Sequence, residues 1–417
     1  MKKADCRVAV IGGGLSGLVI AVGLGRKGYR NVTVLEKDNR LGGKLFTIWY
    51  RGKSYELGAI FGLPVQQHLQ ALLKEFNIKS DGPNLTRVYY DRSGNKIMQI
   101  PKKVLSAFLE EVERLPVTLA EYSSLEKAKI EDLEQPLMMP FSQWCDYHRF
   151  RVLKRIYQHH FTSYGLGDIE QVPALYVLRI LNYDTIMSLL DLPELFTWKT
   201  GVSTLIDALS QKIKNIRLGQ KVIKIAGSNS QRLTVQTEFE QLEFERVVIT
   251  APLEQFSDLY EQDEEMINFL GGIKYQDYYV YAFIVDKLPK GCGVILEHLS
   301  NQNKGHIMIW NSRWESSHQD HLLTVYAYRH PDYSRLASLK VIENDLLRLG
   351  IANPRLYQLK CWKQSPYVDS VALQRGFYQK MEAMQGKHNV FLAGEIMSTV
   401  SMENCLRYAN YLLNQYF

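Results

Sequence analysis

The chain begins with two short, fully apolar runs that flank a longer stretch of small and apolar residues. The two runs are residues 8–11 and 32–35, and the stretch between them covers residues 15–27. Apolar runs of about four to eight residues next to glycine are typical of strands that a parallel sheet buries on both faces. The pattern therefore predicts a strand, a tight turn, a helix and a second strand that ends at Glu36.

Two long regions with different periodicities follow. Residues 101–195 carry apolar side chains at helical spacing, and Pro173 is placed as a first-turn proline would be. Residues 275–329 are rich in tyrosine, valine and isoleucine, which predicts an antiparallel sheet. Strand patterns of the first kind return at residues 222–225, 247–251 and 389–393. We expect the last of these to lead into a helix that runs to the C-terminus.

Three glycines with G-x-G-x-x-G spacing lie in the first turn. Gly12 permits the turn, Gly14 lets backbone approach a pyrophosphate, and Gly17 lets the helix pack against the strand. The free N–H groups at a helix N-terminus favour phosphate, and Glu36 is spaced to accept ribose hydroxyls. This segment predicts a dinucleotide site with the contacts Gly12, Gly14, Ser16, Gly17, Glu36 and Lys37.

A secretory signal is the main alternative for this segment, because Met1-Lys2-Lys3 precede an uncharged run over residues 8–25. The run contains six glycines, charged Asp5 and Arg7 precede it, and no small-residue cleavage motif follows. We therefore reject the signal interpretation.

The motif Arg40-Leu41-Gly42-Gly43-Lys44 directly follows the acidic residue. An R-x-G-G-[KR] segment at this place resembles the large glutathione-reductase-like FAD-binding class, which includes amine oxidases and carotenoid desaturases. The resemblance implies FAD rather than a nicotinamide cofactor. In these flavoproteins a small-residue turn approaches the isoalloxazine ring, and a late Gly-acid pair faces the flavin. The further contacts expected here are Gly43, Lys44, Gly58, Ala59, Ile60, Val222, Gly394, Glu395 and Met402.

These signals lie at opposite ends of the chain and imply one discontinuous cofactor domain. We expect an α/β fold with an α+β substrate region, built on a glutathione-reductase-like FAD-binding Rossmann domain. Its segments would be residues 1–85, 196–255 and 360–417. An inserted, mostly helical lid or substrate domain would cover residues 86–195, and an antiparallel sheet substrate domain residues 256–359.

The composition of the chain says more about its partners and cellular location than about its reaction. The chain has 417 residues, and its net charge of +6 is spread without a basic block, so we expect no nucleic-acid partner. The five scattered cysteines form no C-x-x-C pair, and the adjacent His159-His160 lack further ligands, which argues against a metal site. No segment looks long and apolar enough for a membrane span, and we expect a reducing, cytoplasmic location. The oligomeric state stays open.

A narrower resemblance covers the chain from end to end. The matching stretches are YELGAIFGLP, DGPNLTR, PFSQW, VPALYVLRIL, TWKTG, APLEQF, GFYQKMEAMQG and AGEIMS. They are similar to the bacterial FAD-containing polyenoic fatty acid (linoleate) isomerases, within the amine-oxidase-like superfamily. This resemblance implies that a hydride leaves an allylic carbon for the flavin and returns at another carbon, so that no protein base is required.

Arg87 and Leu189 are the substrate-binding candidates. On its own, Arg87 reads as a surface arginine at the start of a strand, but the resemblance places it where the isomerases anchor the fatty acid carboxylate. Leu189 stands where these enzymes carry an aromatic gate residue. Gln364 and Ser365 replace an aromatic pair before Pro366, which predicts a more polar pocket.

Two other functions remain open. One is an FAD-dependent amine oxidase, desaturase or dehydrogenase that oxidises an apolar small molecule, for which Lys274 is the nearest candidate for a lysine beside the ring. The other is a flavin-binding partner protein without catalysis.

Overall fold

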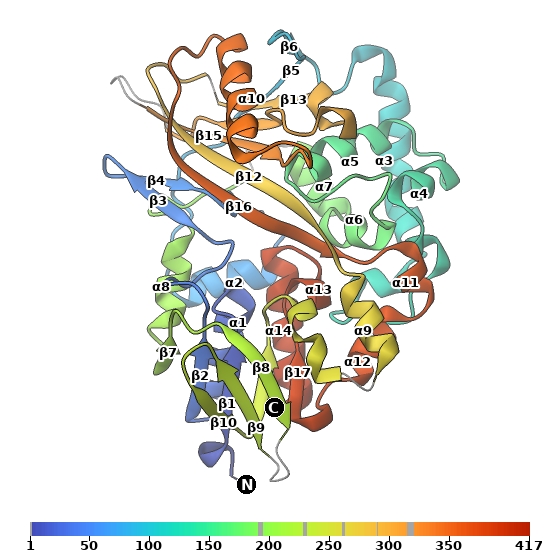
Figure 1. Ribbon diagram of the computed structural model, residues 1–417. Coiled ribbons are helices and arrows are strands. Elements are labelled where there is room, and N and C mark those ends of the chain that lie inside the picture. The colour runs from blue at the N-terminus through green and yellow to red at the C-terminus, as the bar shows by residue number, and fades with distance from the viewer. Residues whose placement is uncertain (1, 191–194, 228–231, 261–262, 290, 315–320) are drawn as a thin grey trace.

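The computed structural model describes residues 2–190, 195–227, 232–260, 263–289, 291–314 and 321–417 (Figure 1). A five-stranded parallel sheet, in the order β17-β11-β1-β2-β7, forms the lower part of the molecule in this view. Its strands are β1 (Arg7–Ile11), β2 (Asn31–Leu35), β7 (Asn215–Arg217), β11 (Arg246–Ile249) and β17 (Val390–Leu392). The sheet is built from distant segments, as the sequence predicted.

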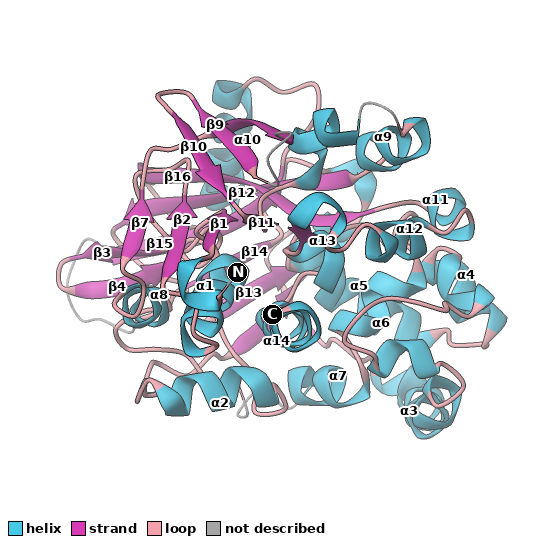
Figure 2. Ribbon diagram, turned by 90° about the horizontal axis from the view of Figure 1, so that it is seen from below, coloured by secondary structure: helices cyan, strands magenta, loops and turns pink. Residues whose placement is uncertain are grey.

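Two helices from opposite ends of the chain pack together beside this sheet (Figure 2). They are α1 (Leu15–Arg26) and α14 (Met402–Tyr416). A Cβ atom on Gly23 of α1 would lie 2.2 Å from Leu413 of α14, so the glycine allows the close approach. The neighbouring elements are α2 (Gln67–Glu75), α8 (Ser203–Ser210), the hairpin β3 (Thr47–Tyr50) and β4 (Lys53–Glu56), and the three-stranded sheet β8 (Val222–Gly227), β9 (Leu233–Thr237) and β10 (Gln241–Phe244).

A seven-stranded sheet forms the second layer, in the order β16-β12-β15-β14-β13-β5-β6. Its long strands β12 and β16 run antiparallel across the middle of Figure 1. The bounds are β5 (Arg87–Tyr90), β6 (Lys96–Ile97), β12 (Lys274–Val285), β13 (Cys292–Ile295), β14 (Ile309–Asn311), β15 (His321–Tyr328) and β16 (Arg355–Tyr367). The sheet takes one strand pair from residues 86–195 and most of β16 from residues 360–417. The domain boundaries themselves stay a prediction.

Helices cover one side of the second sheet and bury large aromatic side chains such as Trp144, Tyr157 and Phe161. They are α3 (Leu105–Leu119), α4 (Phe141–Tyr147), α5 (Val152–Ser163), α6 (Ala174–Ile180) and α7 (Tyr183–Leu190). The remaining helices are α9 (Glu264–Gly271), α10 (Arg335–Arg348), α11 (Ser370–Gln374), α12 (Phe377–Ala383) and α13 (Glu395–Ser398). Short 3₁₀ helices lie at Lys3–Asp5, Lys102–Val104, Ser123–Glu126, Gln135–Met138, Leu253–Tyr260, Leu296–Leu299, Asn301–Asn303 and Lys387–Asn389. No helix in the described ranges combines the length and apolarity needed to cross a membrane.

The predicted C-terminal helix is broken into two. α13 ends at Ser398 and is followed by Thr399, whose φ of 68° lies in the left-handed region. α14 starts after Ser401, whose side chain accepts the N–H of Asn404. A serine N-cap satisfies a backbone donor that the interrupted helix would otherwise leave free. Glu395, at the start of α13, forms an ion pair with Lys44 from the segment after β2.

Candidate cofactor and substrate site

One cavity of about 710 Å³ lies between the parallel sheet, the seven-stranded sheet and the helices α6 and α7. Its wall contains all fifteen residues that the sequence suggested as cofactor contacts, and Leu189 as well. These fifteen residues come from the turns after β1, β2, β4 and β17 and from the starts of α1, β8, α13 and α14. They are Gly12, Gly14, Ser16, Gly17, Glu36, Lys37, Gly43, Lys44, Gly58, Ala59, Ile60, Val222, Gly394, Glu395 and Met402. Their role as contacts stays a prediction.

The glycine-rich turn has the geometry that phosphate approach requires. Gly12 has a φ of 105°, a conformation that favours glycine. A Cβ atom on Gly17 would lie 2.0 Å from the carbonyl oxygen of Gly12, whereas one on Gly14 would meet no atom within 4 Å. Gly17 is therefore needed for packing, and Gly14 leaves open space beside the cavity at the N-terminus of α1.

Glu36 is fixed by two backbone groups. Its Oε2 accepts the N–H of Gly13 at 2.7 Å, and its Oε1 accepts the N–H of Asp38 at 2.9 Å. Each carboxylate oxygen can accept more than one hydrogen bond. The side chain can therefore keep its place in the turn and still accept a ribose hydroxyl.

The second turn joins the two ends of the chain at the cavity. The N–H of Gly42 bonds to the carbonyl of Gly13 at 2.8 Å, which places the turn against the first one. Lys44 Nζ forms an ion pair with Glu395. A Cβ atom on Gly58 would lie 1.8 Å from the carbonyl oxygen of Lys44, so this part of the wall is packed directly on the second turn.

Arg87 does not line the cavity but lies directly behind its wall. Its Nη1 donates to Nδ1 of His160 at 2.9 Å, and its Nη2 donates to the hydroxyl of Tyr164. The ring of Tyr164 lines the cavity and meets that of Phe61 edge-on at 5.3 Å. Burial and the Arg87 charge hold the pKa of His160 well below its ordinary value, so its Nδ1 stays available as an acceptor.

The wall also contains the candidate Leu189 and several residues that no sequence signal indicated. Leu189 is 2% exposed and lies with Ile180 and Leu181 in a part of the wall that α6 and α7 supply. Gln364 lines the cavity as expected, but Ser365 is buried outside it. Further polar lining residues from distant segments are Thr185, Gln255, Tyr275, Lys360 and Lys363.

Lys274 is not at the cavity, so its suggested position beside a flavin ring is wrong. Its Nζ lies 3.0 Å from Oδ2 of Asp369, and its side chain is 50% exposed. The register of β12 with β16, which pairs Lys274 with Tyr367, places it beyond the cavity. The lysines of the described lining are Lys37, Lys44, Lys221, Lys360 and Lys363, and the last two come from β16.

Replacing Lys274 by methionine is therefore expected to leave the rate of cofactor reduction unchanged. An exposed ion pair contributes about 0–1 kcal/mol, so the free energy of unfolding should change by no more than this. Stopped-flow absorbance and urea unfolding measure the two quantities. Lys363→Met, which alters the cavity wall, is the comparison variant. A slower reduction step in Lys274→Met alone would contradict the assignment.

Comparisons with known proteins cover the whole chain. The family model described as flavin-containing amine oxidoreductase matches residues 15–409. The solved structure of a CLA-producing fatty acid isomerase from P. acnes has a TM-score of 0.92 and 28% identity, with 100% of both chains covered. Cyclohexylamine oxidase from Brevibacterium oxydans IH-35A shares the fold at a TM-score of 0.74 and 17% identity, with 98% of both chains covered.

Curated relatives match shorter segments. (S)-6-hydroxynicotine oxidase of Paenarthrobacter nicotinovorans is 28% identical over 262 residues, which is 58% of this chain and 59% of that protein. Polyenoic fatty acid isomerase of Ptilota filicina is 23% identical over 202 residues, which is 42% of this chain and 40% of that protein. The match thus spans less than two thirds of either relative.

Proposed function

The chain belongs to the flavin-containing amine oxidoreductases, and from that premise we propose that it is an FAD-dependent isomerase of a polyunsaturated fatty acid. The observation that carries the proposal is the composition of the cavity described above. It runs from the glycine-rich turn to an apolar wall that includes Leu181 and Leu189. Behind another part of the wall, Arg87 reaches the hydroxyl of Tyr164. One end therefore suits a dinucleotide and the other an acyl chain with an anionic head.

The residues present fit FAD. The open space at Gly14 admits a pyrophosphate beside the N-terminus of α1, and Glu36 is placed to accept ribose hydroxyls. The turn over residues 58–60 forms the wall where the ring would lie, and the Lys44–Glu395 pair closes the same end. When bound, FAD supplies a hydride acceptor that also returns the hydride.

The protein's own part in this reaction is positioning. Apolar side chains from α6 and α7 would hold the acyl chain and exclude water from it. A carboxylate that reached Arg87 would replace the hydroxyl of Tyr164 as the acceptor for its N–H groups, with bidentate geometry. Among the described lining residues, the carboxylates Glu36, Asp38 and Glu395 come from the turns at the FAD-binding end. The proposed reaction needs no base beside the acyl chain.

Net oxidation of an amine is the second candidate. Lys363 favours it, because this reading expects a lysine beside the flavin ring and Lys363 lines the cavity. Its Nζ lies 5.4 Å from the ring centre of Tyr275. Gln364 weakens it, because an amide stands where an aromatic side chain would cage an amine. The two candidates differ in their need for an electron acceptor.

Linoleate incubated with the purified protein without oxygen is expected to gain conjugated-diene absorbance in the ultraviolet. Many product molecules should form per flavin, because the hydride is returned and the cofactor is not consumed. Linoleate deuterated between its double bonds should keep its label in the product. Stearate, which has no allylic carbon, is the matched control. Lasting flavin bleaching without a conjugated product would reject isomerisation in favour of oxidation.

A cytoplasmic location belongs to the same proposal. All five cysteines are unpaired, and three of them are buried. Thiols that stay reduced are usual in a reducing compartment.

A further inference from the structure

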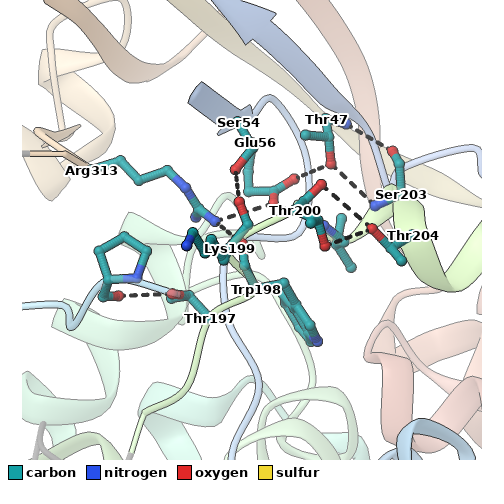
Figure 3. Close-up of polar contacts among 12 residues, drawn as sticks. Thr47, Ser54, Glu56, Thr197, Trp198, Lys199, Thr200, Ser203, Thr204 and Arg313 are labelled. Atoms are coloured by element: carbon teal, nitrogen blue, oxygen red, sulfur yellow. Dashed lines mark hydrogen bonds and ion pairs between the residues drawn. The ribbon is translucent and has the colours of Figure 1, made fainter. Parts of the chain in front are cut away.

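Glu56 is a buried carboxylate that lies two residues before the wall turn over residues 58–60. It ends strand β4, and its side chain is 1% exposed. A carboxylate without water must be held by hydrogen bonds or opposite charge. Glu56 has both, and its partners come from three separate segments of the chain (Figure 3).

The hydrogen bonds of Glu56 tie its hairpin to the segment before α8. Its Oε2 accepts from the hydroxyl of Thr47 at 2.8 Å, and its Oε1 accepts the N–H of Val202 at 2.9 Å. Thr47 and Ser203 exchange two further bonds of 3.0 and 3.1 Å. The carboxylate thus sits where β3, β4 and the start of α8 meet, as Figure 3 shows.

Arg313 approaches the same carboxylate from the segment after β14. Its Nη2 lies 3.6 Å from Oε1 of Glu56 and donates to the carbonyl of Trp198 at 2.5 Å. The arginine side chain is 1% exposed, and its Nε and Nη1 have no hydrogen-bond partner among the described residues. A buried guanidinium with two such donors depends strongly on the carboxylate that faces it.

The backbone of residues 56–59 connects this carboxylate to the cavity wall. The carbonyl of Glu56 accepts from the hydroxyl of Tyr326 at 3.3 Å, and the carbonyl of Leu57 accepts from Nε1 of Trp362 at 2.6 Å. Both aromatic side chains line the cavity. The N–H of Ala59 bonds to the carbonyl of Lys44 at 3.0 Å. Within four residues, the chain passes from the buried carboxylate to the wall of the cofactor site.

We propose that Glu56 is a positioning residue for the flavin: it joins the β3–β4 hairpin, residues 197–203 and Arg313, and so fixes the wall turn over residues 58–60. The proposal rests on the FAD placement given under the proposed function. It does not require that the substrate be a fatty acid. Loss of the carboxylate releases Val202 and Thr47 and removes the anion that faces the buried Arg313, which loosens the wall.

The ionisation of Glu56 supplies a signature that a purely structural residue would lack. Burial raises its pKa to about 7, against the opposing effects of Arg313, the Val202 N–H and Thr47. The other ionisable groups around it are Tyr326 and, on its own hairpin, Tyr55, and burial raises both of their pKa values. Because the folded pKa lies above the ordinary value of 4.5, the stabilisation from protonated Glu56 is complete below about pH 4.5 and is lost as pH rises through 7.

Glu111 provides a matched control. It is also buried, and its carboxylate accepts the N–H groups of Arg151, Val152 and Leu153 at the start of α5. It does not line the cavity. Substitutions at Glu56 and at Glu111 both remove hydrogen bonds to backbone. Only those at Glu56 should change FAD affinity and flavin absorbance.

The test compares Glu56→Ala, Glu56→Gln and Glu111→Ala by FAD titration and flavin absorbance between pH 5.5 and 8.5. We expect Glu56→Ala to lower FAD affinity about tenfold or more and to shift the flavin bands. The wild-type bands should change with a midpoint near pH 7, and this change should be absent in Glu56→Gln. Glu111→Ala should lose thermal stability but keep wild-type affinity and spectrum.

Wild-type FAD affinity and spectrum in both Glu56 variants would overturn the proposal, as would an equal loss of affinity in Glu111→Ala. If Glu56→Ala does not fold, Glu56→Gln and Thr47→Val carry the same comparison. A wild-type protein that binds FAD but does not isomerise linoleate would reject the proposed substrate and leave the role of Glu56 intact. A wild-type protein that binds no FAD would reject both.

Discussion

Gly17→Ala is expected to unfold the start of α1 and to abolish FAD binding. The new Cβ atom would lie 2.0 Å from the carbonyl oxygen of Gly12 and 2.9 Å from Oγ1 of Thr250. Backbone atoms of a buried strand end cannot move aside without breaking the sheet, so we expect a loss of about 3 kcal/mol or more in the free energy of unfolding. Urea unfolding followed by circular dichroism, with FAD content after purification, measures both effects.

Gly14→Ala is the control that separates folding from cofactor binding. A Cβ atom there meets nothing within 4 Å, and the φ of −76° suits alanine. Stability should therefore stay within about 1 kcal/mol of wild type. The methyl group would occupy the space that a pyrophosphate needs, so FAD affinity should fall roughly 100-fold. Equal losses of stability in the two variants, or unchanged FAD affinity in Gly14→Ala, would contradict the assignment.

Arg87→Ala is expected to raise the KM for a polyunsaturated fatty acid roughly 100-fold, because a charged hydrogen bond to carboxylate contributes about 1.5–3 kcal/mol. The flavin spectrum should not change, since Arg87 is not part of the cavity wall. Steady-state kinetics with the free acid and with its methyl ester measures the effect. The ester lacks the anion, so its KM should change little.

Arg92→Ala tests whether any loss of positive charge in this region has the same result. Arg92 lies five residues further on, and its side chain is 79% exposed. The KM of the Arg92→Ala variant should match the wild-type value for both the free acid and the methyl ester. The anchor assignment fails if Arg87→Ala raises the KM for acid and ester alike.

Local patterns predicted the parallel sheet and its turns. The strand β1, the turn glycines and the helix α1 are each defined by residues close together in sequence, where backbone sterics and apolar periodicity act directly. The same reasoning could not anticipate the break at Thr399. Its left-handed φ depends on packing between α13 and α14 rather than on the apolar spacing of the segment.

The positions of the candidate substrate-binding residues depend on pairing between strands that are far apart in the sequence. A local pattern does not encode such pairing. Arg87 lies at the start of β5, and its distance from the cavity follows from the parallel pairing of β5 with β13. Lys274 was misplaced for the same reason, since only its register with Tyr367 shows that it lies beyond the wall. Tyr275 and Lys363 line the cavity from the same two strands, yet neither belongs to a motif. Leu189 could be named as a candidate only from the resemblance to a family.

The parallel sheet also imposes an order on biosynthesis. Its strand β17 comes from residues 390–392, and α13 and α14 follow it. A nascent chain whose residues 390–416 are still inside the ribosome lacks an outer strand of the sheet, the partner of Lys44 and the helix that packs on α1. The glycine-rich turn is synthesised well before residues 390–416, and its site becomes complete only when those residues emerge. Cofactor loading therefore follows the emergence of residues 390–416, and the strands made earlier must avoid wrong partners until then.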